Sequence, residues 1–115
     1  MPLRILFSES SPNLGGQELQ LLQQMAALQA RGVAVKLACR PGSGIHQAAS
    51  QRGFELEPVA FRNSLHPPSI LCIRRLLQSW RPDVVVSHSG HDANVCGVAA
   101  RLLPQRPRMV RVRTY

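Results

Sequence analysis

The densest group of side chains able to do chemistry lies at residues 87–92, directly after a run of three valines. This stretch reads Ser-His-Ser-Gly-His-Asp. An imidazole can donate a hydrogen bond on one side and accept one on the other, so His88 suits acid–base work or contact with sugar and phosphate groups. Ser89 and His91 add further hydrogen-bonding groups, and Asp92 adds a carboxylate. The stretch is therefore a candidate binding or catalytic segment.

Two alternatives for this segment stay open. Asp92 stands at the start of an expected helix, where it could instead serve as the N-cap. His88, His91 and Asp92 have metal-ligating side chains, but no cysteine or glutamate with suitable spacing completes a set, so no metal is predicted.

A second polar stretch, residues 8–16, follows the first apolar run and ends in Gly15-Gly16. It matches neither G-x-G-x-x-G nor G-x-x-x-x-G-K-[ST], so a dinucleotide fingerprint and a P-loop are both excluded. The two glycines precede a helix-patterned segment, whose free N–H groups could hold a phosphate or a carboxylate. The same glycines could equally do no more than allow a tight turn.

The elements that must position these stretches alternate between strand and helix patterns. Strands are expected at residues 3–8, 33–38, 54–59, 84–87 and 109–113, and helices at 16–30, 43–52, 67–80 and 93–103. This spacing is typical of right-handed parallel crossovers and predicts a doubly wound, Rossmann-like α/β sheet with strand order 3-2-1-4-5. Strands one and four are then neighbours, and the two polar stretches face each other across the topological switch point, where such folds bind ligands.

Length, composition and charge limit the number of domains, the cellular location and the kind of partner. With 115 residues and 44 % hydrophobic content, the chain fits one globular domain. It has neither a signal peptide nor an apolar run of membrane-spanning length, so a cytoplasmic location is expected. The cysteines are too scattered for a disulfide pattern or a C-x-x-C motif. A net charge of +8 favours anionic partners such as phosphorylated substrates or a membrane surface, whereas 4 % aromatic content does not favour nucleic acid.

Several segments together resemble the N-terminal domain of family-4 glycosyltransferases of the GT-B type. They are Arg4-Ile5-Leu6-Phe7 followed by Gly15-Gly16-Gln17-Glu18, then Arg31-Gly32-Val33-Ala34-Val35, Arg81-Pro82-Asp83-Val84-Val85, residues 88–92 and Val110-Arg111-Val112-Arg113-Thr114. Residues 61–65 resemble a subset that acts on lipopolysaccharide-type acceptors. The resemblance covers residues 1–115, although Tyr115 stands where relatives often have histidine.

The resemblance implies one half of a retaining hexosyltransferase that moves a sugar from a UDP- or GDP-linked donor to a saccharide or lipid-linked acceptor, with no further cofactor. It implies that Gly15 and Gly16 approach the donor diphosphate and that His88 lies near the transferred sugar. Asp92 matches an acidic position found in part of the family, so His88 and Asp92 are the catalytic candidates. By the same comparison, acceptor contacts are expected from Asn13, Arg62, Asn63, Ser89 and His91.

The donor-binding C-terminal domain of that family, with its E-x-x-x-x-x-x-x-E motif, is absent from the 115 residues. We therefore expect the isolated chain to be inactive, to act near the inner membrane in its complete form, and to be able to self-associate through the edge of the fifth strand. The alternative reading is a non-enzymatic basic module that binds an anionic ligand or partner.

Overall fold

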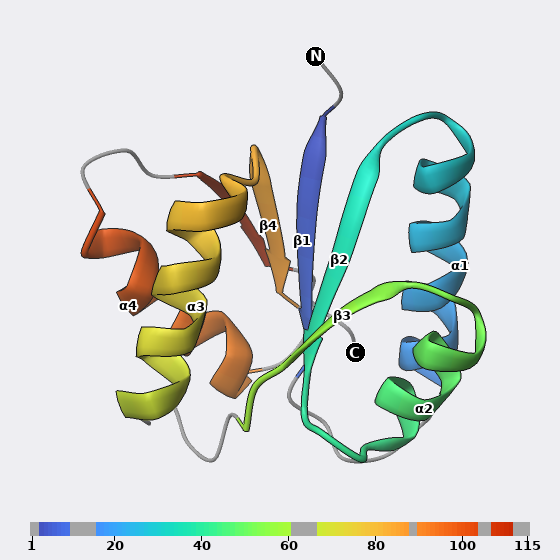
Figure 1. Cartoon of the computed structure of the whole chain (residues 1–115), viewed down its shortest axis with the longest axis horizontal. Helices are drawn as coiled ribbons and strands as arrows, with labels where there is room; N and C mark the ends of the chain where they lie inside the picture. The colour runs from blue at the N-terminus through green and yellow to red at the C-terminus, as the bar shows by residue number, and fades with distance from the viewer. Residues whose placement is uncertain (1–2, 10–15, 61–66, 88–89, 104–106, 112–115) are drawn as a thin grey trace.

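The computed structural model describes residues 3–9, 16–60, 67–87, 90–103 and 107–111. Strands and helices alternate through this part of the chain (Figure 1). In order they are β1 (Arg4–Glu9), α1 (Gly16–Ala30), β2 (Ala34–Cys39), α2 (Gly44–Gln51), β3 (Glu55–Pro58), α3 (Pro67–Trp80), β4 (Val84–Ser87), α4 (Gly90–Arg101) and β5 (Arg108–Arg111).

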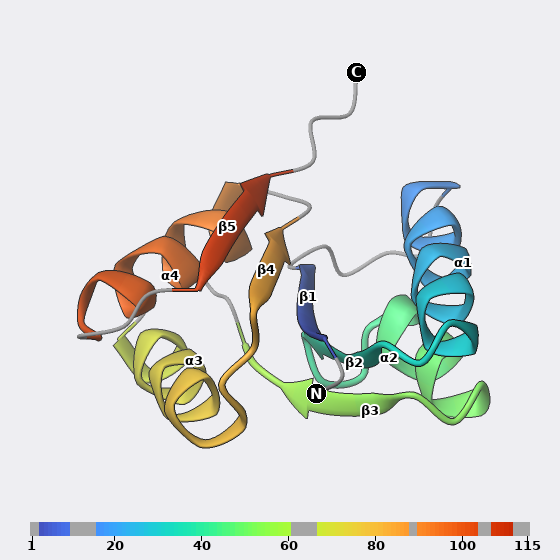
Figure 2. The same cartoon turned by 90° about the horizontal axis from the view of Figure 1, so that it is seen from above.

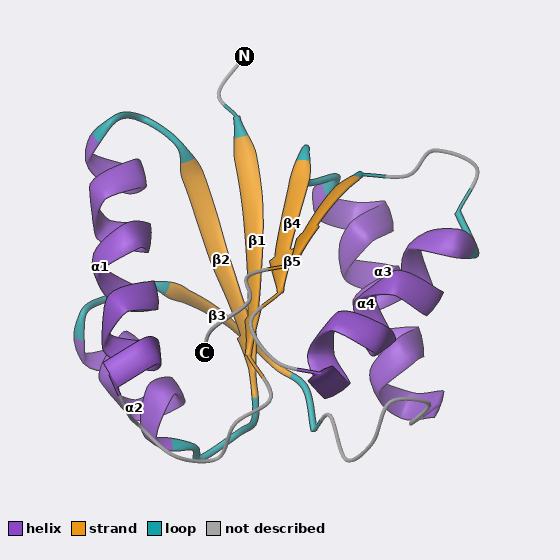
Figure 3. Ribbon diagram, turned by 180° about the vertical axis from the view of Figure 1, so that it is seen from behind, coloured by secondary structure: helices purple, strands orange, loops and turns teal. Residues whose placement is uncertain are grey.

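The described strands form one parallel sheet in the order β3-β2-β1-β4-β5, which confirms the predicted topology. Helices α1 and α2 cover one face of the sheet, and α3 and α4 cover the other (Figures 1 and 2). Seen from behind, α3 and α4 lie side by side (Figure 3). The chain thus changes face in the connection from β3 through α3 to β4, and the strand order reverses between β1 and β4, as in a doubly wound fold.

Each face of the sheet has its own apolar core, because successive side chains of a strand point to opposite faces. On the face of α1 and α2, Phe7 and Leu37 pack with Met25 and Ile45. On the face of α3 and α4, the alternate strand residues pack with side chains of both helices. This core includes Leu6, Ala38, Val85, Ile73, Leu77, Val95 and Ala99. We call these the α1/α2 core and the α3/α4 core.

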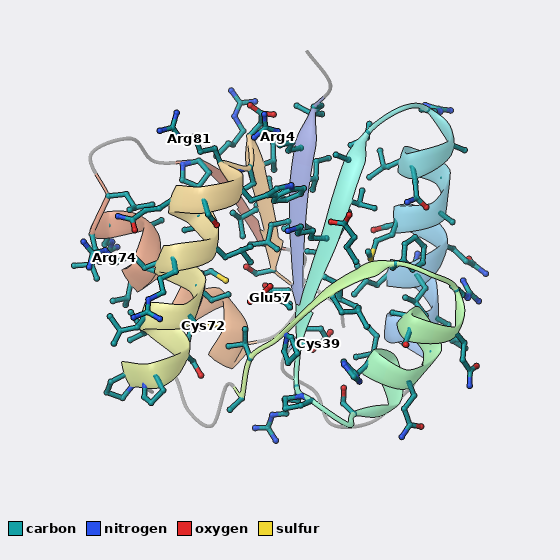
Figure 4. The ribbon with its side chains drawn as sticks, in the orientation of Figure 1. Arg4, Cys39, Glu57, Cys72, Arg74 and Arg81 are labelled. Carbon is teal, nitrogen blue, oxygen red and sulfur yellow. The ribbon has the colours of Figure 1, made fainter. Side chains whose placement is uncertain are left out.

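The amino end of β1 is tied to the end of α3 by two residues. The Arg4 N–H donates to the Asp83 carboxylate at 2.9 Å, and the Asp83 N–H donates to the Arg4 carbonyl at 2.8 Å. The Arg4 guanidinium also donates to the carbonyl of Trp80, the last residue of α3. Arg81 then reverses the chain with a φ of 52° before Pro82 (Figure 4). The conformation of Arg81 and the following proline end the helix, as the sequence predicts.

Most observed boundaries lie within two residues of the expected ones, and two of the differences concern the candidate site. Strand β1 continues through Glu9, because Glu9 pairs with Cys39 of β2 in the parallel ladder. Helix α4 begins at Gly90 and not at Ala93, so Asp92 lies inside its first turn. The N-cap alternative for Asp92 is therefore wrong, since an N-cap residue precedes the first helical residue.

Candidate functional site

The carboxyl ends of β1 and β4 meet at the centre of the sheet. Ser8 of β1 is in register with Ser87 of β4, and both side chains are buried. Residues 10–15 lead from β1 to α1 on one face, and residues 88–89 lead from β4 to α4 on the other. The two polar stretches of the sequence therefore leave the sheet from adjacent strands at the same edge. This is the topological switch point at which open α/β sheets bind their ligands.

Helices α1 and α4 both begin at this edge. The first N–H groups of a helix have no partner within the helix, and the aligned peptide dipoles place partial positive charge there. Gly16 is the first residue of α1 and Gly90 is the first of α4. Two helix starts at one switch point favour an anionic ligand such as a diphosphate, and we call the ligand position expected there the switch-point crevice.

The predicted site residues fall into two groups in this structure. Asn13, Gly15, Arg62, Asn63, His88 and Ser89 lie outside the described residues. Gly16, His91 and Asp92 have a described helical backbone, at the first position of α1 and the second and third positions of α4. The side chains of the last two are not described, so the assigned roles remain predictions.

At the carboxyl ends of β1 and β4, three residues of the two polar stretches are buried, which the sequence does not predict. Ser8, Glu9 and Ser87 are each no more than 2 % exposed. Strand alternation puts Ser8 and Ser87 on the α3/α4 face, beside Leu6 and Val85 of that core. The Ser87 hydroxyl has no hydrogen-bond partner in the described part of the chain. Ser8 and Ser87 therefore form a polar floor at the switch point on the α3/α4 face.

Glu9 lies on the opposite face of the sheet, next to Cys39 at the end of β2. The pKa of the Cys39 thiol is raised to about 12, mainly by burial and also by the Glu9 carboxylate, whereas the side-chain interaction with Ser43 lowers it. A thiol with this pKa is protonated near neutral pH and is not a nucleophile. Cys39, Cys72 and Cys96 are all free, as the sequence predicts.

The signal that could have located this floor is the Ser-Glu pair at residues 8–9. By residue type Glu9 indicates a loop, whereas its burial depends on the extension of β1 along β2, and Ser8 pairs with both β2 and β4. Within the described residues, no group of three or more histidine, cysteine, aspartate or glutamate side chains could hold a metal ion. None of the described helices is both long and apolar enough to cross a membrane.

This arrangement has clear counterparts among solved structures. MurG from Acinetobacter baumannii matches with a TM-score of 0.75 at 16 % identity, covering 99 % of this chain and 37 % of that one. A glycosyltransferase from Rickettsia africae matches with a TM-score of 0.75 at 17 % identity, covering 96 % of this chain and 29 % of that one. HepE from Anabaena, solved with UDP and glucose, gives 0.69 at 17 % identity, with coverage of 95 % and 29 %.

At this identity the similarity defines the fold, which is the Rossmann-like half of a GT-B glycosyltransferase. A family model for the glycosyl transferase 4-like domain matches residues 15–115, and the chain belongs to that family. No curated protein sequence matches the chain significantly. The chain spans about a third of the length of the solved structures described above.

Proposed function

We propose that this chain is the acceptor-binding domain of a retaining glycosyltransferase of the hexosyltransferase type. Its donor would be a UDP- or GDP-linked sugar, and its acceptor a saccharide or lipid-linked glycan of the cell envelope, as in lipopolysaccharide assembly. The observation that carries the proposal is the family match over residues 15–115 on a sheet in which β1 and β4 are neighbours. Two relatives by fold were solved with dTDP and with UDP and glucose, which supports a nucleotide-sugar donor.

In this proposal the donor binds at the start of α1 and the acceptor hydroxyl binds at the start of α4. Gly15 and Gly16 leave room for the donor diphosphate at the start of α1, where the N–H groups and the dipole offset the charge of the leaving group. Asp92, in the first turn of α4, and His88, which precedes α4 in the sequence, would orient the acceptor hydroxyl toward the anomeric carbon. Holding the two reactants in this geometry is itself a large part of catalysis.

The acceptor would extend along the same edge of the sheet. The sequence places Asn13 between β1 and α1, and it places Ser89 and His91 just before and just after the first residue of α4. The segment before α3, which also begins at this edge, contains Arg62 and Asn63. The net charge of +8 suits a phosphorylated or membrane-linked acceptor, so we extend the proposal to peripheral binding at the cytoplasmic face of the inner membrane. A separate donor-binding domain would close the other side of the crevice.

The proposal is tested first by binding. UDP and GDP are titrated separately into the isotope-labelled chain, and amide shifts are followed by NMR. We expect weak binding of one of them that moves the amides of Gly16 and Gly90 and leaves that of Arg31 unchanged. Gly15→Asp should weaken it at least about tenfold, because a carboxylate beside a diphosphate is repelled.

The matched control is Gln47→Asp, which adds the same charge at an exposed position in the first half of α2. It should leave the affinity unchanged. If an inorganic polyphosphate moves the same amides as strongly as either nucleotide, the chain is a basic binding module and the proposed function is wrong.

The second test is transfer of radiolabelled sugar to a saccharide acceptor by the purified 115-residue chain. We expect no transfer, because half of the cleft cannot hold donor and acceptor together. Transfer that the His88→Ala variant abolishes would contradict the need for a second domain.

A further inference from the structure

A groove of about 490 Å³ lies between α3 and the outer strands β2 and β3. None of its lining residues belongs to β1, β4, α1 or α4, so it is separate from the switch-point crevice. The lining comes from one long wall on the helix and a shorter wall on the sheet: Lys36, Glu57, Pro68, Leu71, Cys72, Arg75, Leu76 and Ser79. In Figure 4, Cys72 on α3 and Glu57 on β3 lie across this space from each other.

The sheet wall of the groove carries an unusual number of charges for a parallel strand pair. Lys36 is in register with Glu55, and Ala38 is in register with Glu57. Of these four residues only Ala38 is apolar, and it packs in the α3/α4 core. Parallel strands normally have helices packed on both faces, but an apolar helix here would strip water from three charged groups. This part of the sheet therefore suits a polar ligand.

The charges at the groove are only partly paired. The Lys36 ammonium is 3.8 Å from the Glu55 carboxylate and 5.1 Å from the centre of the Trp80 ring. The Cys72 sulfur is 4.0 Å from the Glu57 carboxylate oxygen Oε1. Arg75 is exposed and makes no ion pair or hydrogen bond with another described residue. The helix wall thus offers a free guanidinium opposite an ammonium and a carboxylate.

We propose that this groove binds a phosphorylated sugar, with the phosphate on Arg75 and Lys36 and the sugar hydroxyls on Glu57 and Ser79. A guanidinium presents paired donors that match phosphate oxygens, and a lysine adds a point charge. A carboxylate accepts hydrogen bonds from hydroxyl groups but repels a bare phosphate, which selects the sugar ester over the free ion. The volume lies within the range of small-molecule sites.

This inference rests on the proposed function, because it gives a phosphorylated saccharide of the transfer reaction a second binding place on the same domain. It names residues that the family resemblance does not assign. The groove also contains its own reporter: Cys72 is half-buried within it, whereas Cys39 and Cys96 are fully buried. A ligand in the groove should shield the Cys72 thiol.

The experiment measures alkylation of Cys72 by N-ethylmaleimide in mildly alkaline buffer, followed by peptide mass spectrometry. Glucose 1-phosphate, glucose and inorganic phosphate are compared at equal concentrations. We expect saturable protection of Cys72 by glucose 1-phosphate and at least about tenfold weaker protection by either part alone, since each part omits one set of hydrogen bonds. Equal protection by glucose or by inorganic phosphate would overturn the proposal, as would no protection.

Three variants assign the contacts, each compared with and without ligand because the charge of Arg75 itself affects the Cys72 thiol. Arg75→Gln should raise the half-protecting concentration about tenfold. Glu57→Gln should reduce the preference for glucose 1-phosphate over inorganic phosphate. Arg31→Gln, at an exposed position beyond the end of α1, should change neither value.

A loss of protection in Arg31→Gln as large as that in Arg75→Gln would mean that net charge alone governs binding, and would overturn the proposal. The outcome is independent of nucleotide binding at the crevice, because the probe has no nucleotide and the readout lies on α3. A chain that fails the UDP and GDP titrations can still show protection of Cys72, so the two proposals can fail separately.

Discussion

At the scale of single residues, the buried Cys39 thiol makes stability depend on alkaline pH. Its pKa is raised from 9.0 to about 12 in the folded chain, chiefly by burial. Above pH 9 the unfolded chain loses this proton while the folded chain keeps it, so stability that is complete below pH 9 is lost as the pH rises toward 12. The slope from one such proton is at most about 1.4 kcal/mol per pH unit.

Urea denaturation of the wild-type chain and of Cys39→Ala at pH 8, 9 and 10 measures this effect. We expect the wild-type free energy of unfolding to fall more steeply than that of the variant above pH 9. Cys72 also has a raised pKa and accounts for part of the slope that remains. Parallel curves for the two proteins would show that Cys39 ionises no differently in the folded chain.

At the scale of elements, α2 depends on a single side chain for its start. The Ser43 hydroxyl accepts a hydrogen bond from the His46 N–H at 3.2 Å and donates one to the Arg40 carbonyl at 2.7 Å. Ser43 is also buried, so its replacement leaves these groups without a partner and without water. Ser43→Ala should lower the free energy of unfolding by about 1–2 kcal/mol.

Hydrogen exchange of the amides of α2 checks this prediction locally. Exchange at His46 and the following residues should accelerate in Ser43→Ala, whereas Ser43→Asn, which keeps a capping oxygen, should recover most of the protection. Ser50→Ala, at an exposed position of the same helix, serves as the control. Equal loss in Ser50→Ala would mean that helix content and not the cap is responsible.

The same scale shows what could be predicted from the sequence. Helix α3 was predicted with the observed bounds, because Pro67 fits a first turn, apolar residues recur on one face, and Pro82 prevents continuation. The strand order followed from crossover spacing alone. Glu9 could not be placed, because a carboxylate in a buried strand contradicts the average behaviour of its residue type. Only the pairing of Glu9 with Cys39 of β2 shows that Glu9 belongs to the strand.

One part of the ligand-binding regions could also be predicted from the sequence and another part could not. That the loops after β1 and β4 leave adjacent strands was predictable, since topology determines which strand ends are neighbours. The groove along α3 was not, because it depends on how far α3 extends across β2 and β3. The sequence shows the alternating Glu55 and Glu57 of an edge strand, but a helix position relative to a strand is a property of packing.

At the scale of the whole molecule, the described sheet ends in β5, whose outer edge pairs with no described strand. Met109 and Val110 are 39 % and 41 % exposed, and Arg108 and Arg111 bound the strand. An open edge with exposed apolar side chains is a template for pairing with a second copy of the chain. The net charge of +8 opposes that pairing by repulsion between copies.

We therefore predict that the chain self-associates through β5 and that association increases with salt. The range of electrostatic repulsion falls from about 30 Å at 0.01 M to about 3 Å at 1 M ionic strength, while the attraction between apolar side chains persists. Sedimentation velocity at these two ionic strengths should show monomer at low salt and dimer or larger species at high salt.

Two matched substitutions locate the contact. Val110→Lys places a charge on the β5 edge and should keep the chain monomeric at both salt concentrations. Leu19→Lys adds the same charge on α1, where the original side chain is 43 % exposed, and should associate like the wild-type chain. Because both variants raise the net charge equally, a difference between them reports the position of the contact and not the total repulsion. A wild-type chain that stays monomeric at every salt concentration would refute the prediction.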